Sequence, residues 1–444
     1  MLKAIRRQYW VSQQFFKRHY TLIYRTIILV ILFSLITAVF IKYIPAPRAH
    51  FRLGVVGKYT PETLPTEIKK LVSRGLVTMD EAGNPQPALA KSWQVEEDGK
   101  RYVFELDQDL RWHNGDKLVA EDLNYNFSDV EVKTNGSKLI FNLKDPFAPF
   151  FYAVERPILK NGRLGVGEYT LAKSNVYSGI LQSVTLISPT TQLTYKFYPT
   201  ENSALTAFKL GEIDQLNNLS YVPTEMSSDS RIEISPNNGQ EKLAVLFFNN
   251  NDTTLASKST RQALAYAIQD KSFGHTRARS PILESSWAYN PLVKAYDFDA
   301  TRAKELLKQD FPEASELKIE LKTMLQYLDE AEIIAEDWRA NLGIRVEVRV
   351  VTNLTNDYQV FLADYAPPAD PDQYTIWHST QPTNFTHYTN LKVDKLLEDG
   401  RRTLDRKLRK DIYQDFQRFL LEDSPAVFLF QTTSYNLSRK KLFE

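Results

Sequence analysis

The sequence of residues Pro87–Leu106 is PALAKSWQVEEDGKRYVFEL. Within it, Arg101–Leu106 alternates polar side chains with large apolar ones, a pattern typical of a strand with one buried face. Ser92–Val95 predicts a second strand, and Glu97–Lys100 between them is a turn signal. The stretch therefore predicts an antiparallel hairpin.

The β-rich pattern continues to about residue 162 and is flanked by mixed patterns of helix and strand. Inside it, a helix is expected to begin at Ala120, and two more strands are expected at Asp129–Lys133 and Lys138–Leu143. Outside it, we expect strands at Phe51–Val56, Gly167–Leu171, Leu193–Tyr198, Lys242–Asn249, Leu317–Thr323, Ile344–Val351 and Val427–Phe430. We expect helices at Glu67–Val72, Ser203–Leu210, Ser259–Gln269 (with Ser259 or Thr260 as N-cap), Asp299–Lys308 and Leu328–Asn341, and two within Val393–Phe419. Mixed segments that enclose a β-rich insertion predict lobes with a cleft between them, a common place for a ligand.

Composition excludes several classes of protein. The chain has 444 residues, which predicts more than one domain, and no cysteine, which excludes disulfides, thiolate zinc sites and a catalytic cysteine. Residues 1–46 contain seven basic and no acidic residues, so 48 basic residues stand against 54 acidic ones in the remainder. That remainder lacks the basic excess expected of a nucleic-acid-binding protein.

Residues Thr26–Ile44 (TIILVILFSLITAVFIKYI) are apolar apart from Lys42. Nineteen helical residues span about 28 Å, close to the thickness of a bilayer core. Residues 26–44 are therefore predicted to be a transmembrane helix. Six basic residues precede it, so residues 1–25 are expected to be a cytoplasmic basic tail and residues 50–444 to lie outside the cell. A cleaved signal peptide is the alternative; the long N-terminal region and the lack of a clear A-x-A site favour an anchor.

The sequence shows no catalytic or metal-binding motif. None of the six histidines forms a metal-spaced pair, and no nucleophile elbow or phosphate-binding loop is present. Gly162, Gly165 and Gly167 have the wrong order for a dinucleotide fingerprint and favour a turn before a strand. We therefore expect a protein that is not an enzyme and that uses no cofactor and no metal site.

Four blocks carry a family resemblance in a fixed order. The first contains GLVT (75–78), PALAKSW (87–93), DGKRYVFEL (98–106), RWHNGD (111–116) and AED (120–122); the others are RQALAYAI (261–268), RAKELL (302–307) and the segment Trp338–Val348 with NLGI (341–344). Together they resemble the extracellular solute-binding proteins of the peptide/nickel class, typified by oligopeptide- and dipeptide-binding proteins of ABC importers.

The resemblance implies an α/β, type II periplasmic-binding-protein fold with two lobes and a third domain, preceded here by the transmembrane helix. Domain I would comprise residues 50–88, 163–241 and 427–444, domain II residues 89–162, and domain III residues 242–426. Domain II is reduced, because the region between Asn126 and Arg163 is shorter than is typical of the family. Closure of the lobes around a solute is the implied mechanism.

The resemblance also suggests ligand-binding residues. Family members that bind peptides hold the ligand's α-amino group with an aspartate in an A-D-Y-x-D-P loop, and Phe361–Tyr374 here is FLADYAPPADPDQY. Asp364 matches the first part of the motif and Asp370-Pro371-Asp372 the second, with three extra residues between them. Asp364 or Asp372 would be the ammonium anchor, although each could instead cap a turn in a proline-rich loop. The other candidate ligand-binding residues are Trp377, His378, Trp287 and Tyr289; Trp377 could equally be a core residue.

The predicted function is thus a membrane-anchored extracellular receptor that captures a small peptide or similar solute and delivers it to an ABC transporter permease. We expect it to act as a monomer and to bind no nucleic acid. The alternative is a sensor or scaffold that uses the same fold without transport. The sequence does not distinguish a short peptide from a nickel chelate or an oligosaccharide.

Overall fold

The computed structural model describes residues 2–41, 48–352 and 357–440. Its helices are α1 (Leu2–Ile41), α2 (Thr66–Val72), α3 (Phe150–Val154), α4 (Glu201–Lys209), α5 (Thr224–Ser227), α6 (Lys258–Ala267), α7 (Ala300–Asp310), α8 (Leu328–Leu342), α9 (Tyr374–Trp377), α10 (Leu391–Arg402) and α11 (Arg406–Asp423). Its strands are β1 (Ala49–Val56), β2 (Val77–Met79), β3 (Pro85–Pro87), β4 (Ala90–Glu96), β5 (Arg101–Leu106), β6 (Val130–Asn135), β7 (Lys138–Leu143), β8 (Thr170–Tyr177), β9 (Ile180–Ile187), β10 (Thr191–Tyr198), β11 (Gln215–Leu219), β12 (Ile232–Phe248), β13 (Lys318–Thr323), β14 (Arg345–Val350), β15 (Val360–Tyr365) and β16 (Ala426–Arg439).

The N-terminal unit contains α1, a helix of 40 residues. Its segment Gln13–Leu35 is long and apolar enough to cross a membrane and has none of its window buried in protein. This segment begins earlier than the predicted span, residues 26–44. Residues 42–44 of that span, the residues next to them up to 47, and residues 441–444 of the predicted domain I lie outside the described residues.

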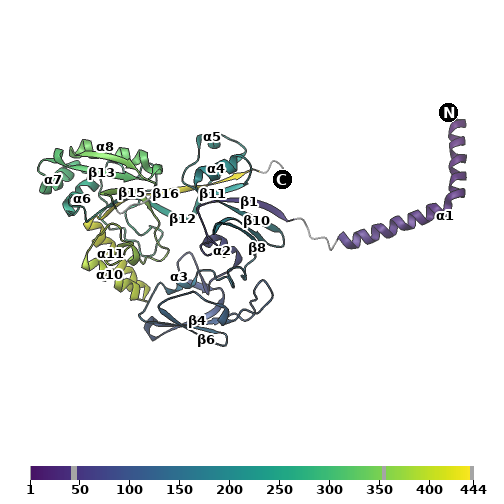
Figure 1. The fold of residues 1–444 in the computed structure, drawn as a ribbon, viewed down its shortest axis with the longest axis horizontal. Coiled ribbons are helices and arrows are strands. Elements are labelled where there is room, and N and C mark those ends of the chain that lie inside the picture. Colours follow the sequence, from purple (N-terminus) through teal and green to yellow (C-terminus); the bar gives the residue numbers. More distant parts are fainter. Residues whose placement is uncertain (1, 42–47, 353–356, 441–444) are drawn as a thin grey trace. The chain divides into compact units, whose positions relative to one another are not determined.

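The second unit is organised by a ten-stranded sheet in the order β14-β13-β15-β12-β16-β11-β1-β10-β9-β8. Strands β12 and β16 pair antiparallel over nearly their whole length, from Ile232 opposite Arg439 to Phe247 opposite Ala426. β12 also pairs with β15, and β16 with β11. The two long strands therefore belong to both halves of the sheet and are its only connection among the described strands (Figure 1).

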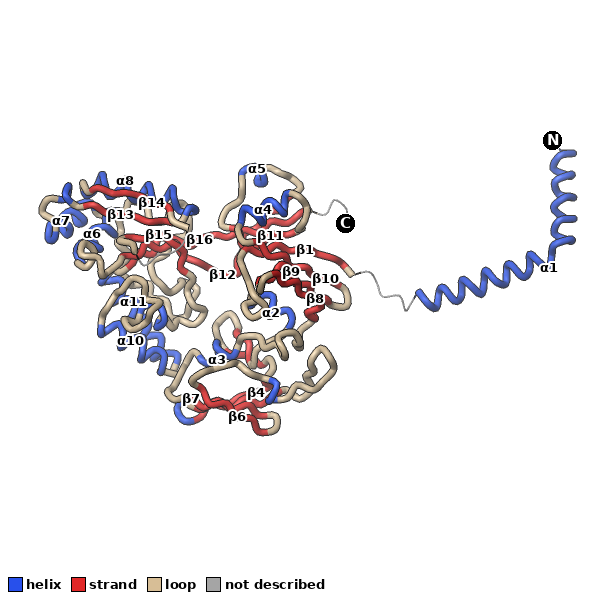
Figure 2. Tube along the Cα trace, viewed as in Figure 1, coloured by secondary structure: helices blue, strands red, loops and turns tan. Residues whose placement is uncertain are grey.

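The half of the sheet that contains β15 is covered on both faces (Figure 2). Alternate residues of β12 point to opposite sides, as a strand requires. Leu246 and Phe248 pack against α6, α7 and α8, whereas Val245 and Phe247 pack against α10 and α11. Two apolar cores thus fix the orientation of the side chains of Leu243–Phe248 and of the residues of β15 that pair with them.

The predicted hairpin forms half of a separate four-stranded sheet, β4-β5-β7-β6. Strand β5 has the predicted bounds. Its large apolar side chains, Tyr102, Phe104 and Leu106, are the buried ones, as the alternating sequence predicts. Tyr102 and Phe104 pack on Phe150 of α3, with ring centroids 4.4 and 6.4 Å away. The predicted hairpin is therefore confirmed, with exact bounds for Arg101–Leu106 and with a partner strand, β4, longer than the predicted Ser92–Val95.

Two local predictions were wrong, and a third identified a strand correctly but made it too short. Ala120 begins only a single 3-10 turn, Ala120–Asp122, because the chain leaves it in an extended conformation that buries Leu123 and Tyr125. The N-cap of α6 is Ser257, and the hydroxyls of Ser257, Ser259 and Thr260 all donate to Asp310 Oδ2 rather than cap the helix. Val427–Phe430 is only the start of β16, whose later residues are less buried and more polar.

Gly165 and Gly167 serve a close approach of two backbones rather than a simple turn. A Cβ atom at Gly165 would lie 1.9 Å from the carbonyl oxygen of Val72, and one at Gly167 would lie 2.5 Å from that of Leu71. The Gly167 amide donates to Val72 O at 2.8 Å. These contacts hold α2 against the segment that leads into β8.

Candidate ligand cleft

A cavity of about 770 Å³ borders Glu241, which lies on β12 where that strand passes from one half of the large sheet to the other. One wall comes from α2, the β2–β3 turn and α3; the other comes from the loops that follow α6 and β15. Its lining residues are Lys70, Met79–Gly83, Tyr152, Glu155, Glu241, Ile282, Leu283, Ser285–Trp287, Pro367–Ala369, Pro371, Gln373 and Arg406. The volume lies in the range of small-molecule sites.

The loop after β15, Pro367–Gln373, is restrained by its own prolines and by ion pairs with two arginines. Its three prolines restrict φ. Asp370 is buried and accepts from Arg409 at 2.7 Å, while Asp372 is paired with Arg401 at 2.9 Å. Burial raises the pKa of Asp370, and the hydrogen bonds from Arg409 oppose that effect. The loop therefore presents its prolines and Gln373 to the cavity while its carboxylates face two arginines.

Charge in the cavity lining is predominantly negative. The acidic residues are Asp80, Glu81, Glu155 and Glu241, against Lys70 and Arg406. Lys70 is paired with Glu155 at 3.0 Å, and Arg406 donates to Asn84 Oδ1 at 2.6 Å. Glu241 has a weaker polar contact, from Ser285 Oγ at 3.3 Å. The cavity is thus suited to a solute that carries positive charge.

Two aromatic side chains contribute apolar surface and one hydroxyl. Trp287 lies under the guanidinium of Arg406, 4.8 Å from ring centroid to Cζ. Burial raises the pKa of Tyr152 to about 12, so its hydroxyl stays protonated at neutral pH. A ring and a hydroxyl donor near carboxylates form a surface that can contact both apolar and polar parts of a solute.

Asp364 lies on the other face of the sheet. It is opposite Ala244, and it accepts a hydrogen bond from the Tyr327 hydroxyl and a longer one, 3.4 Å, from Gln326. It borders a separate cavity of about 160 Å³ together with His275 and Glu330. Asp364 and the Asp370–Asp372 segment are therefore not brought together, and the proposal that either Asp364 or Asp372 binds an ammonium group stays a prediction.

The remaining predicted site residues occupy different surroundings. Trp377 is buried against Phe428 in the α10–α11 core, and His378 is buried with its Nδ1 atom 2.9 Å from the Thr380 hydroxyl. Trp287 lines the large cavity, whereas Tyr289 borders a cavity of about 60 Å³ and donates to Glu284 at 3.1 Å. Of the seven candidates, Trp287 is the one whose side chain lines the large cavity.

Sequence reasoning missed Glu241, Tyr152 and Arg406 in the cavity lining. Glu241 immediately precedes the predicted strand Lys242–Asn249, and a charged residue at the edge of a buried strand was a usable signal. Tyr152 and Arg406 gave none, because their positions depend on contacts between segments far apart in the chain. Among residues 2–41, 48–352 and 357–440, no group of three or more histidine or acidic side chains is arranged to hold a metal ion.

Comparison with known proteins identifies the family. The model of the bacterial extracellular solute-binding proteins, family 5, matches residues 84–162 and 189–387, more than half of the chain. The chain belongs to this family. It is therefore a solute-binding protein of the ABC-importer type, of the peptide/nickel class, and the resemblance found in its sequence is confirmed.

Individual relatives are distant but cover most of the chain. The probable D,D-dipeptide-binding periplasmic protein DdpA of Escherichia coli is 22% identical, with 80% of each chain aligned. The structure of NikZ from Campylobacter jejuni in complex with Ni(L-His) has a TM-score of 0.75 at 24% identity and covers 89% of this chain and 94% of that one. The structure of AppA from Bacillus subtilis in complex with a nonapeptide has a TM-score of 0.69 at 20% identity, covering 89% and 95%. These structures confirm the type II periplasmic-binding-protein fold.

Proposed function

We propose that the protein is a membrane-anchored extracellular receptor, not an enzyme, that captures a peptide-like solute with a free ammonium group between its lobes and delivers it to an ABC permease. The domains are those expected from the sequence, and we assign domains I (50–88, 163–241, 427–444) and II (89–162) to one lobe and domain III (242–426) to the other. The apolar segment of α1 would anchor the chain, with the binding domains outside the cell.

The observation that supports this most directly is the negative cavity beside β12. Glu241 is exposed and lies where the only two strands that connect the halves of the described sheet pass between them. A carboxylate that accepts a hydrogen bond from an ammonium group contributes about 1.5–3 kcal/mol. Trp287 and Tyr152 would contact the rest of the solute, and relatives named as peptide-binding support the solute class.

A thermal-shift screen tests the proposal. The protein is titrated with short peptides, with the same peptides acetylated at the amino terminus, with nickel chelates and with oligosaccharides. A ligand at 100 times its dissociation constant stabilises the folded state by about 2.7 kcal/mol. We expect stabilisation by free-amine peptides, and its loss on acetylation.

The variant Glu241→Gln examines the anchor itself. It should weaken binding of the free-amine peptide by about ten- to a hundredfold, as expected for loss of one charge-assisted hydrogen bond. Glu332→Gln, at an exposed position of α8, is the matched control and should bind as the parent does. Equal binding of free and acetylated peptides would exclude the ammonium anchor. No stabilisation by any solute class would favour the sensor or scaffold function.

A further inference from the structure

The segment where α10 ends and α11 begins, which we call the corner (Gly400–Arg406), contacts the β-rich part of the chain at two points and the β2–β3 turn at a third. The carbonyl oxygen of Arg401 accepts from the Ala148 amide at 2.8 Å. Leu404 packs against Gly99, where a Cβ atom would lie 2.7 Å from Leu404 Cδ1. Arg406 donates to Asn84. The corner is thus a main contact between the proposed domain III and the proposed domains I and II.

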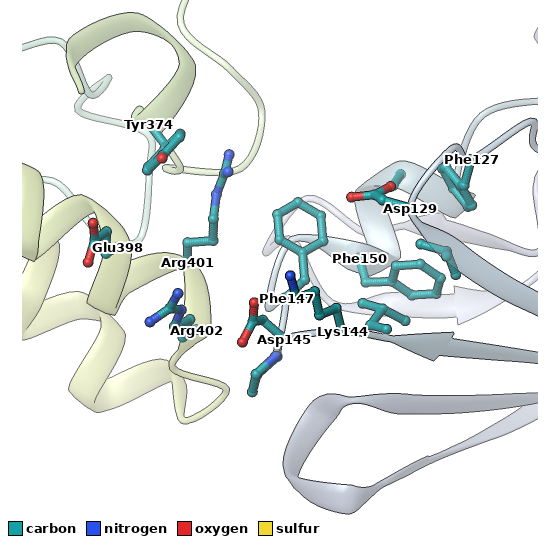
Figure 3. A pocket seen from close by; sticks show the side chains of 14 residues that line it. Phe127, Asp129, Lys144, Asp145, Phe147, Phe150, Tyr374, Glu398, Arg401 and Arg402 are labelled. Atoms are coloured by element: carbon teal, nitrogen blue, oxygen red, sulfur yellow. The ribbon is translucent and has the colours of Figure 1, made fainter. Parts of the chain in front are cut away.

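Arg401 contacts both the loop Pro367–Gln373 and the β-rich part; Figure 3 shows its side chain between Tyr374 and Phe147. Its guanidinium donates twice to Asp372 of the loop Pro367–Gln373, at 3.0 and 2.9 Å. The same group lies 4.0 Å from the centroid of the Tyr374 ring and 5.2 Å from that of Phe147. Because Asp372 and Tyr374 belong to one lobe and Phe147 to the other, the guanidinium is shared between them.

The cation is well placed for this role. The Arg401 side chain is 26% exposed and its partner Asp372 is 9% exposed, so both are partly screened from water. A cation over an aromatic face is attracted by the ring quadrupole, and arginine stacks there while keeping its in-plane hydrogen bonds. If the loop Pro367–Gln373 moved, Asp372 would withdraw the guanidinium from Phe147.

We propose that Arg401 is a positioning residue that makes closure of the lobes depend on the conformation of the loop Pro367–Gln373. This inference rests on the proposed binding function, because it assumes that the lobes open and close. It assigns to Asp372 a role in holding Arg401, and it names one side chain through which occupancy of the cavity would bias closure. The cavity of about 460 Å³ beside Arg401, Phe147 and Tyr374 gives these side chains room to rearrange.

The experiment measures closure without any solute, so it is independent of whether a ligand has been found. The full chain in detergent micelles has no native cysteine, so Gly99→Cys with Leu404→Cys supplies a single reporter pair. A Cβ atom at Gly99 would lie 3.1 Å from Leu404 Cγ, which is compatible with a disulfide. The strain of a side chain at Gly99 is common to all variants compared. The rate of disulfide formation then reports how often the lobes meet.

Arg401→Ala is expected to slow disulfide formation by about three- to tenfold, the effect of removing a partly desolvated cation–π contact. Arg402→Ala is the matched control, because Arg402 is exposed, lies next to Arg401 on the same helix and makes none of the contacts described for Arg401. Arg402→Ala should leave the rate unchanged. Equal rates for the two variants would overturn the proposal.

Phe147→Leu tests the same contact from the other lobe and keeps an apolar side chain while removing the ring, so it guards against a folding defect of Arg401→Ala. It should slow disulfide formation to a similar extent in the parent. In the Arg401→Ala background it should add little, because the contact is already lost. Effects that multiply in the double variant would show two independent contacts and would overturn the proposal. Binding results with Glu241→Gln do not affect either outcome.

Discussion

Lys271 is buried, no carboxylate in the described part of the chain is paired with it, and its replacement by methionine should stabilise the protein. The side chain is 5% exposed, and its Nζ atom donates to Ile268 O at 2.7 Å. Burial, helped by the positive charge of Arg277, lowers the pKa of Lys271 from 10.5 to about 8. The ammonium group is therefore retained at neutral pH at a cost to the folded state.

The magnitude follows from the difference in pKa. A shift from 10.5 to about 8 corresponds to roughly 3 kcal/mol at about 1.4 kcal/mol per unit. Lys271→Met removes this cost but leaves the Ile268 carbonyl without its donor, a loss of about 1 kcal/mol. At pH 7 the variant should therefore be more stable than the parent by about 2 kcal/mol.

The same shift in pKa fixes how the stability contributed by Lys271 changes with pH. Between pH 8 and 10.5 the unfolded chain keeps the proton on Lys271 and the folded chain releases it. The unfolded state then binds more protons, so the free energy of unfolding contributed by this residue rises with pH across that window. The advantage of Lys271→Met over the parent should shrink as pH rises from 7 to 10.

Urea unfolding at pH 7, 8.5 and 10 measures both effects, provided that the m-value is unchanged. Lys308→Met, at an exposed position near the end of α7, is the control and should stay close to the parent at every pH. Other groups titrate alike in parent and variant and cancel in the difference. A Lys271→Met protein that is less stable than the parent at pH 7, or an advantage independent of pH, would refute the reasoning.

Two further predictions concern the backbone and the anchor. Gly165→Ala should destabilise the protein by about 3 kcal/mol, because its Cβ atom would lie 1.9 Å from the Val72 carbonyl oxygen. Gly136→Ala is the control and should cost about 1 kcal/mol, because φ is positive there but a Cβ atom meets nothing within 4 Å. Equal unfolding midpoints in denaturant for the two variants would contradict this account. The full chain should stay in the membrane fraction after alkaline washing. Protease added outside intact cells should remove the residues beyond 50 and leave a small N-terminal fragment. A soluble chain that begins after residue 44 would instead indicate a cleaved signal peptide.

The fold prediction rested on short patterns of apolar residues, which succeed for a physical reason. The alternation in Arg101–Leu106 is decided by which face of one hairpin meets one core, so six residues contain the information. Leu243–Phe248 of β12 was equally readable, because a continuous apolar run predicts a strand that is buried on both faces. The helix expected at Ala120 failed because the burial of Leu123 and Tyr125 outweighed local helix propensity.

The candidate site was less predictable, because it depends on register and on distant partners. Whether Asp364 points toward one core or the other is set by its pairing with Ala244. The partners of Asp370 and Asp372, Arg409 and Arg401, come from later helices with no spacing that links them to the loop. A motif thus located the loop but could not show which of its carboxylates were already paired.

The position of β16 in the large sheet also constrains how the chain can fold. β16 lies between β11 and β12, so neither half of that sheet is complete until residues 426–439 have arrived. If the chain is exported from its N-terminus as proposed, the β4–β5 hairpin could form early, whereas both halves of the large sheet would have to wait for the last strand to cross the membrane. Until then β11 and β12 expose unpaired edges, which attract other strands. Secretion of this protein should therefore depend on factors that shield the nearly complete chain, and shortening it before Ala426 should produce aggregates rather than a smaller receptor.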